Sequence, residues 1–301
     1  MSDIATKKRT RGGGGAARRA SRTSISFETE KFIERKIPLF EILNDEALEI
    51  IETNAELMLE EVGVAFVNNP KALELWRNAG ADLDGERVHV PKGLARNLIK
   101  TAPSSFTQYA RNPNRSVDIG GNTLVCAPVY GPPFVRDIDG GRRYATIEDF
   151  QKFVKLGYMS KWLHHSGGTL CEPTDIPVNK RHLDMLLAHM TLSDKPFMGS
   201  VTEPSRAQDS VDMCEILFGS DFVQNKTVMT SLININSPMT FDDVMMGAME
   251  VRMHPIDPIV QPYCVAFHLA VDLNRSQQRF HRLQNQPRRH PLEIIPPQWW
   301  Q

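Results

Sequence analysis

Three short strand-like runs recur in the middle of the chain, and each ends in small or polar residues before a helix-like pattern begins. They cover residues 163–168, 196–201 and 227–234, so their centres lie about 33 residues apart. A strand with its loop and crossover helix needs roughly 30 residues, so this spacing predicts consecutive βα units of a parallel sheet, open or closed into a barrel. In both arrangements the functional residues lie at the carboxyl ends of the strands.

Helical patterns follow these runs, at residues 177–192, 205–218 and 241–251. Two capping-box patterns, at 146–149 and 240–243, indicate further helix starts, because a Thr at the N-cap and an acidic residue three positions later pair with free backbone N–H groups. We expect the first box to open a helix whose apolar face carries Phe150, Phe153 and Val154.

An amphipathic helix is expected nearer the N-terminus. Asn44 is a good N-cap, and Asp45 and Glu46 place negative charge in the first turn, where the helix dipole favours it. Gly63 suits the end of this helix. Its apolar residues share one face: Leu48, Ile51, Ala55, Met58, Leu59 and Val62. We interpret this segment as a helix that packs into the core.

Shorter elements are expected up to residue 145. They are a helix at 70–79 followed by Gly80, a turn at 84–85, a strand at 86–90, a helix at about 91–101, short strands at 106–110, 116–119 and 123–127, and a hairpin of 134–137 with 142–145. The loop 127–136 contains three prolines and Gly131, so it is rigid enough to hold Tyr130 in place. A stiff connector into the hairpin is the alternative interpretation.

The chain divides into four parts by composition. Residues 1–25 form a basic, glycine-rich tail that buries too little apolar surface to fold, and we predict that it is disordered. Residues 26–145 form the N-terminal helical and β region, and residues 146–251 the first βα units. Residues 252–301 contain no Gly, Lys or Thr and are rich in Pro, Gln, Arg and His. This last part is predicted to be poorly ordered.

The overall composition excludes several classes of protein. The net charge of −1 argues against a nucleic-acid binder, and no apolar run reaches the roughly 18 residues of a membrane helix. Four scattered cysteines without a C-x-x-C pair, and the lack of a secretory signal, fit the cytoplasm. Adjacent His164 and His165 point to opposite faces of a strand, so a metal site is not expected. The common nucleotide-binding and hydrolase motifs are missing.

The sequence resembles the trimethylamine methyltransferase family from about residue 40 to 251. The resemblance rests on the helix at 44–62 with Gly63-Val64, the loop 127–136, residues 146–150, and Asn234-Ile-Asn-Ser-Pro-Met239 leading into Phe241-Asp-Asp. The basic tail also looks like that family. No residue corresponds to the pyrrolysine of some members, which favours a non-pyrrolysine member.

The resemblance implies a (β/α)₈ TIM-type barrel preceded by a helical and β-hairpin region. It also implies methyl transfer from a methylated or quaternary amine, betaine-like or trimethylamine-like, to the cobalt of a partner corrinoid protein, in cytoplasmic one-carbon metabolism such as methanogenesis. The corrinoid is carried by the partner, so no cofactor is expected on this chain itself. The repeats account for only part of a barrel. We therefore expect a C-terminally truncated copy that is impaired or depends on association, including with a second copy of itself.

A site for a methylated cation needs aromatic faces and carboxylates. The candidates are Tyr130, Trp162 and Glu203, with core packing the alternative for Trp162 and a helix-start charge the alternative for Glu203. Asn234, Asn236 and Ser237 are candidates for binding a carboxylate, or alternatively for anchoring the loop after the third strand. We assign no catalytic residue and no metal ligand.

Two other functions compete with methyl transfer. A different barrel enzyme, such as a lyase acting on a small anion, would need a lysine or metal cluster at a strand end, and residues 160–251 show no such pattern. A non-catalytic truncated fragment or partner-binding protein is the other alternative, and the composition of residues 252–301 supports it.

Overall fold

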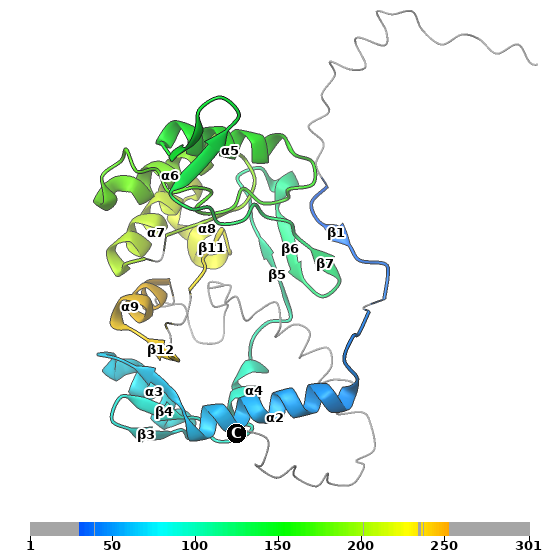
Figure 1. Cartoon of the computed structure of the whole chain (residues 1–301), viewed down its shortest axis with the longest axis vertical. Coiled ribbons are helices and arrows are strands. Elements are labelled where there is room, and N and C mark those ends of the chain that lie inside the picture. Colours follow the sequence, from blue (N-terminus) through cyan, green and yellow to red (C-terminus); the bar gives the residue numbers. More distant parts are fainter. Residues whose placement is uncertain (1–29, 39, 201, 234–235, 237, 253–301) are drawn as a thin grey trace, which may run out of the picture.

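The computed structural model describes residues 30–38, 40–200, 202–233, 236 and 238–252. The tails predicted at 1–25 and 253–301 therefore lie outside the described residues. The described part is a mixed α/β structure with several small sheets (Figure 1). Its elements are β1 (Ile33–Glu34), α2 (Asp45–Glu61), β2 (Val64–Phe66), α3 (Pro70–Ala79), β3 (Asp82–Asp84), β4 (Arg87–His89), α4 (Leu94–Ile99), β5 (Ser105–Gln108), η1 (Pro113–Arg115), β6 (Val117–Gly120), β7 (Thr123–Leu124), β8 (Phe134–Asp137), β9 (Gly141–Tyr144), α5 (Ile147–Met159), α6 (Val178–Leu192), β10 (Phe197–Met198), α7 (Pro204–Phe218), α8 (Ser220–Asn225), β11 (Met229–Thr230), β12 (Thr240–Phe241) and α9 (Asp243–Arg252).

The parallel βα pattern is confirmed in its coarse form. β10 and β11 pair in parallel, and the helices α6, α7 and α9 occupy the expected segments. The first strand-like run, 163–168, lies beside β10, because the Met198 N–H donates to the Gly167 carbonyl at 2.9 Å. Among the described residues these strands do not close into a barrel. The short helix α8 was not expected, and it follows Gly219, whose φ of +87° suits the end of α7.

A four-stranded sheet, in the order β12-β2-β4-β3, lies beneath these units with α2, α3 and α4 (Figure 1). The N- and C-terminal ends of α3 match the expectation, with Pro70 at its start and Gly80 left-handed at its end. The sheet and α3 pack around a core that includes Phe66, Val88 and, from α9, Met246. Packing between α9 and this core ties the third βα unit to the N-terminal region.

The capping box expected at 240–243 is wrong. Thr240 and Phe241 form β12, which runs parallel to β2, and the Ala65 N–H donates to the Met239 carbonyl at 3.0 Å. Asp242 caps α9 instead, because its Oδ1 accepts from the Met245 N–H at 2.7 Å. The backbone pairing with β2 holds Thr240 extended, and this moves the helix start two residues onward.

The interpretation of α2 as a core-packing helix is also wrong. Its cap at Asn44 is confirmed, but none of its residues is buried, and Ile51 and Met58 are about half exposed. Arg96 from α4 binds Glu52 and Glu56 of α2, at 2.9 and 2.5 Å. These ion pairs turn the acidic side of α2 toward the protein, so most of its apolar stripe stays outside.

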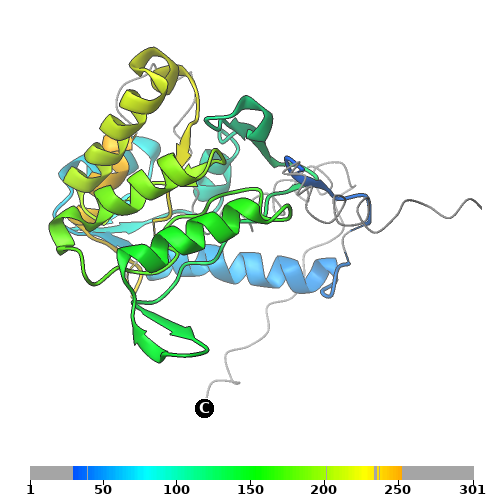
Figure 2. The same cartoon turned by 90° about the horizontal axis from the view of Figure 1, so that it is seen from above.

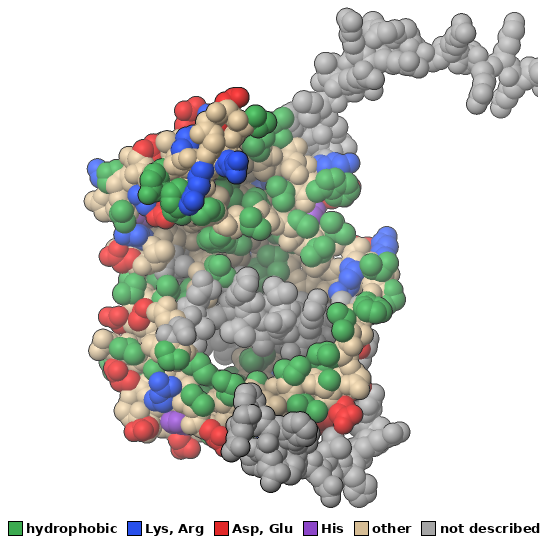
Figure 3. Space-filling model, in the orientation of Figure 1, with side chains coloured by type: hydrophobic (Ala, Val, Ile, Leu, Met, Phe, Trp, Pro, Cys, Tyr) green, Lys and Arg blue, Asp and Glu red, His purple; other side chains and the backbone are tan. Residues whose placement is uncertain are grey.

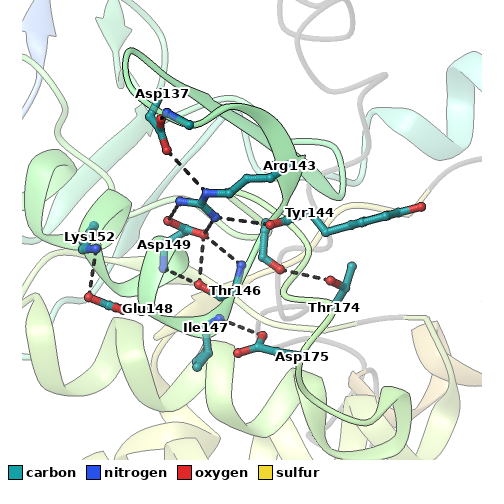
Figure 4. Close-up of polar contacts among 12 residues, drawn as sticks. Asp137, Arg143, Tyr144, Thr146, Ile147, Glu148, Asp149, Lys152, Thr174 and Asp175 are labelled. Carbon is teal, nitrogen blue, oxygen red and sulfur yellow. Dashed lines mark hydrogen bonds and ion pairs between the residues drawn. The ribbon is translucent and has the colours of Figure 1, made fainter.

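The β-rich region is confirmed as two antiparallel pairs, β5 with β6 and β8 with β9. The β8–β9 hairpin projects from the helices (Figure 2). The capping box at Thr146 is confirmed, and Arg143 of the hairpin binds the Asp149 carboxylate inside it (Figure 4). This contact joins the hairpin to the start of α5. In the described part of the chain, no helix is both long and apolar enough to cross a membrane.

Candidate functional site

The carboxyl ends of the parallel segments meet at one edge. The run 163–168 neighbours β10 through the Met198 N–H bond to the Gly167 carbonyl, and β10 neighbours β11 through the Gly199 N–H bond to the Thr230 carbonyl, both at 2.9 Å. The residues that follow each strand therefore lie near one another. This edge is the place where the sequence predicted function.

Tyr130 lies over this edge. The Gly131 N–H donates to the Thr169 carbonyl at 2.9 Å, which ties the loop 127–136 to the residues that follow the first run. The Tyr130 hydroxyl is 3.5 Å from the Met198 Sδ, and a Cβ on Gly168 would lie 2.6 Å from that hydroxyl. The expectation of a loop that positions Tyr130 is met in its geometry. Tyr130 is 45% exposed.

Glu203 follows β10 and stands at the N-cap of α7. Its carboxylate pairs with Arg206 Nε at 3.2 Å, and Arg206 also donates to the Thr202 hydroxyl at 3.1 Å. Glu203 thus lies at the expected edge, and its charge already has a cationic partner from the first turn of α7. That geometry favours the helix-start role over direct binding of a cation.

Asn236 follows the third strand and closes a turn. It exchanges two backbone hydrogen bonds with Thr240, at 2.8 and 2.9 Å, and its Nδ2 donates to Asp242 Oδ2 at 2.7 Å. These contacts are the loop-anchoring interactions that the sequence left open as an alternative. Asn234 and Ser237 lie outside the described residues, so their roles stay predictions.

Trp162 lies at the other end of the strands, just before the first run. It is 56% exposed, and Lys161 Nζ lies 4.6 Å from its ring centroid. On the same amino side, the buried Lys195 donates to the carbonyls of Ser160 and Leu163 at 2.8 and 2.6 Å. Burial, with the nearby Arg115 charge, lowers the pKa of Lys195 to about 8. The described contacts do not bring Trp162 to Tyr130.

A buried polar network behind the edge was missed from the sequence. Gln108, at the end of β5, is fully buried. Its Nε2 donates to the Phe197 carbonyl at 2.9 Å, and its Oε1 lies 3.2 Å from His165 Nε2 and 3.5 Å from the Thr230 hydroxyl. One amide therefore contacts all three parallel segments. The available signal was a Gln ending a strand, which is too common to be informative.

Two histidines of this network are held neutral. His165 Nδ1 accepts from the Gly167 N–H at 2.8 Å, so its proton is on Nε2. His189 Nε2 faces the Gly168 carbonyl at 2.8 Å and must donate to it, which leaves Nδ1 to accept from the Ser166 hydroxyl at 2.7 Å. Burial lowers the pKa of His165 to about 3 and that of His189 to about 4. Both therefore act as fixed dipoles under the edge rather than as proton carriers near neutral pH.

The other histidine of the pair points elsewhere. His164 Nδ1 accepts from the Cys126 N–H at 2.9 Å, whereas His165 Nε2 faces Gln108. The two side chains therefore face different partners. Among the residues that the structure describes, no group of three His, Cys, Asp or Glu side chains is arranged to hold a metal ion.

These features define the class of the protein. Parallel βα units carry the loop of Tyr130 over their carboxyl edge, beside a mixed N-terminal region. The family model of trimethylamine methyltransferase (MTTB) matches residues 11–266. The chain therefore belongs to that family.

Similar proteins are methyltransferases that differ in the donor they are named for. The chain is 43% identical over 214 residues to glycine betaine methyltransferase of Desulfitobacterium hafniense (strain Y51), covering 71% of this chain and 44% of that protein. It is 27% identical over 158 residues to proline betaine:corrinoid methyltransferase of Eubacterium limosum, covering 51% and 32%. It is 31% identical over 83 residues to trimethylamine methyltransferase of Desulfitobacterium hafniense (strain DSM 10664 / DCB-2), covering 27% and 16%. The chain thus spans less than half the length of these relatives.

Proposed function

We propose that this chain takes part in methyl transfer from a betaine-class quaternary amine to the cobalt of a partner corrinoid protein. We choose a betaine as the methyl donor because the similarity to glycine betaine methyltransferase extends over 214 residues. The similarity to the trimethylamine enzyme extends over 83 residues. The word "corrinoid" in the name of the proline betaine relative supports the acceptor. We also propose that residues 146–251 are the first units of a (β/α)₈ barrel, supported by the parallel pairing of β10 and β11.

Methyl transfer from a quaternary amine needs little acid–base catalysis by the protein. The N–CH₃ bond breaks, its electron pair stays on nitrogen, and a neutral tertiary amine leaves. The corrinoid cobalt of the partner supplies the nucleophile that takes the methyl group. What remains for this chain is to hold a cation that cannot donate a hydrogen bond, and to keep its methyl group facing the partner.

Tyr130 is our candidate for holding that cation. An aromatic face attracts a quaternary ammonium through the ring quadrupole, and the attraction grows when water is excluded. The ring is fixed by the loop contact at Gly131 and by Met198. Gly168 lets the hydroxyl end of the ring pack closely against the backbone, because a Cβ there would lie 2.6 Å from the Tyr130 hydroxyl.

The other site residues have supporting roles in this proposal. Asn234, Asn236 and Ser237 would bind or position the carboxylate that distinguishes a betaine from trimethylamine. Glu203 would act through Arg206, with which it is paired. Trp162 stays a candidate only if the donor or partner reaches the amino side of the strands. We place the activity in cytoplasmic one-carbon metabolism, with methanogenesis as one setting and self-association as one form of assembly.

The test is methyl transfer to a reduced corrinoid protein with glycine betaine, proline betaine, carnitine and trimethylamine offered separately. We expect the betaines to be the better donors. Tyr130→Ala should lower kcat/KM about tenfold, since a desolvated cation–π contact contributes ~1–2 kcal/mol. Tyr130→Phe should keep most of the activity.

Tyr144→Phe is the matched control, because this tyrosine is exposed on the β8–β9 hairpin, away from the edge. Equal activity of wild type and Tyr130→Ala, with unchanged circular dichroism, would remove Tyr130 from the site. Faster transfer from trimethylamine than from any betaine would contradict the choice of donor.

A second candidate function is binding without catalysis. The composition of residues 252–301, which contain no Gly, Lys or Thr, favours it. A folded chain that transfers no methyl group from any of the four donors, yet binds the corrinoid protein in a pull-down, would favour this alternative.

A further inference from the structure

The outer face of α2 has no described partner large enough to cover it. The helix contacts the protein through Leu59, which packs on the N-terminal core, through the Arg96 ion pairs, and through hydrogen bonds from Val90 and His89 to the carbonyls of Leu59 and Glu60. Its exposed large apolar side chains are Ile50, Ile51, Leu57, Met58 and Val62, each between 44% and 54% exposed. Figure 3 shows hydrophobic side chains across the lower part of the molecule, where α2 runs in Figure 1. An exposed apolar face of this length marks a surface that another segment or molecule covers.

The negative charge of α2 indicates which kind of segment can bind its apolar face. The α2 segment holds seven Asp and Glu residues and no Lys or Arg. Two of them, Glu52 and Glu56, bind Arg96 of α4. Two copies of such a helix would repel each other, so a second copy packed through α2 is disfavoured. An occupant with basic residues and some apolar surface is favoured.

The chain itself contains such a segment. Residues 1–25 hold seven Lys and Arg residues, which are Lys7, Lys8, Arg9, Arg11, Arg18, Arg19 and Arg22. Ile25 and Phe27 follow them. The 29 residues before Glu30 can span up to ~95 Å, whereas the 17 residues of α2 are about 26 Å long. The segment before Glu30 is therefore long enough to extend along α2.

We propose that the basic segment 1–29 docks on α2 of the same chain and covers its apolar face. The Lys and Arg heads pair with the acidic residues, and their aliphatic stems lie over the exposed Ile and Met side chains. Such a contact is largely electrostatic, so it weakens at high salt. It gives the basic tail an acidic partner within the protein, in place of nucleic acid. The proposal is independent of methyl transfer.

Hydrogen exchange of the α2 amides tests the proposal on the full 301-residue chain. A variant with all seven basic residues of the tail changed to Gln should exchange about tenfold faster in α2 at low salt, which corresponds to ~1.4 kcal/mol. A variant with every Lys changed to Arg and every Arg to Lys should behave as wild type. The α7 amides serve as the folding control and should not change in either variant.

Salt and dilution complete the test. In 1 M salt the Debye length falls to about 3 Å, so wild-type α2 should exchange as fast as the Gln variant. Hundredfold dilution should leave the wild-type protection unchanged. Equal α2 exchange in wild type and Gln variant at low salt would overturn the proposal. Protection that falls on dilution would overturn it in favour of a second copy as the occupant.

Discussion

The Arg143 guanidinium donates to both carboxylate oxygens of Asp149, with nitrogen–oxygen distances of 2.5 and 2.8 Å (Figure 4). The same carboxylate accepts from the Thr146 N–H and hydroxyl, each at 2.9 Å. The Arg143 guanidinium and these bonds hold the pKa of Asp149 well below its usual range. One side chain therefore joins the hairpin to the capped start of α5, which is the helix before the parallel units.

Asp149→Ala should destabilise the protein by about 1–2 kcal/mol, because the capping box is lost and Arg143 loses its main partner. Urea unfolding followed by circular dichroism measures this. Glu148→Ala is the matched control, since Glu148 is exposed in the same turn and pairs only with Lys152. We expect no measurable change from the control. Equal unfolding midpoints for both variants would show that the Asp149 contacts add nothing.

Stability should fall on mild acidification because of His165 and His189. Their pKa values are lowered by burial to about 3 and about 4, from an ordinary 6.5. The unfolded chain therefore binds more protons than the folded one below pH 6.5. The stability that these neutral histidines contribute is complete above that pH and is lost as pH falls toward their folded values.

Urea midpoints measured between pH 6.5 and 5 check this, because the ordinary carboxylates stay ionised there. The expected slope is about 1.4 kcal/mol per pH unit for each histidine. His189→Gln should reduce the slope, since one contributing group no longer titrates, and His164, whose pKa burial also lowers, keeps part of it in both proteins. A midpoint that does not move across this range in wild type would mean that neither histidine is held neutral.

Gly131 should not tolerate a side chain. A Cβ there would meet the Leu170 carbonyl oxygen at 1.8 Å, and that oxygen belongs to backbone that cannot rotate away. Gly131→Ala should destabilise the protein by about 1–3 kcal/mol, and it should displace Tyr130. Tryptic digestion across the loop and thermal melting both report the change.

Gly157→Ala provides the comparison. Its Cβ would lie 3.7 Å from Pro128, an ordinary contact, and Gly157 is inside α5, where Ala is the better helix former. The control should be as stable as wild type or more so. A Gly131→Ala variant as stable as this control would show that the loop at residue 131 can move without cost.

The sequence predicted elements whose cause is local. The ends of α3 follow from Pro70 and Gly80, the start of α5 from its own capping box, and the parallel units from a spacing set by the length of a crossover. The rigid loop around Tyr130 follows from its three prolines, and the role of Tyr130 itself stays a prediction. Each of these signals lies within a few residues of the feature it predicts.

What the sequence could not show depends on partners far along the chain. The rotation of α2 is set by Arg96, which is 44 residues from Glu52 and 40 from Glu56. β12 is a two-residue strand that exists because β2 is available to pair with it. Trp162 was grouped with Tyr130 by residue type, although the two lie at opposite ends of the strands. A pattern along one segment carries no information about these contacts.

Loss of the Gln108 amide should weaken contacts to more segments than the other substitutions proposed above. Its amide contacts the Phe197 carbonyl, His165 and the Thr230 hydroxyl, so it joins β5 to all three parallel segments. Gln108→Leu keeps a similar volume and leaves the His165 N–H buried without an acceptor. Because an unpaired buried donor costs roughly 1–3 kcal/mol, we expect a loss of about 2 kcal/mol in unfolding free energy.

The matched change is Gln208→Leu, on the exposed side of α7, where the amide reaches only Asp212. It should alter stability by less than about 0.5 kcal/mol. Hydrogen exchange adds a reading that global unfolding lacks, because Gln108→Leu should speed exchange at Gly167 and Met198, whose backbone bond lies beside the amide's partners. If exchange there stays at the wild-type rate while the protein is destabilised, the cost comes from the unpaired His165 N–H and the amide does not hold these segments together. Faster exchange would make the amide the element that keeps the first two parallel segments together beneath Tyr130.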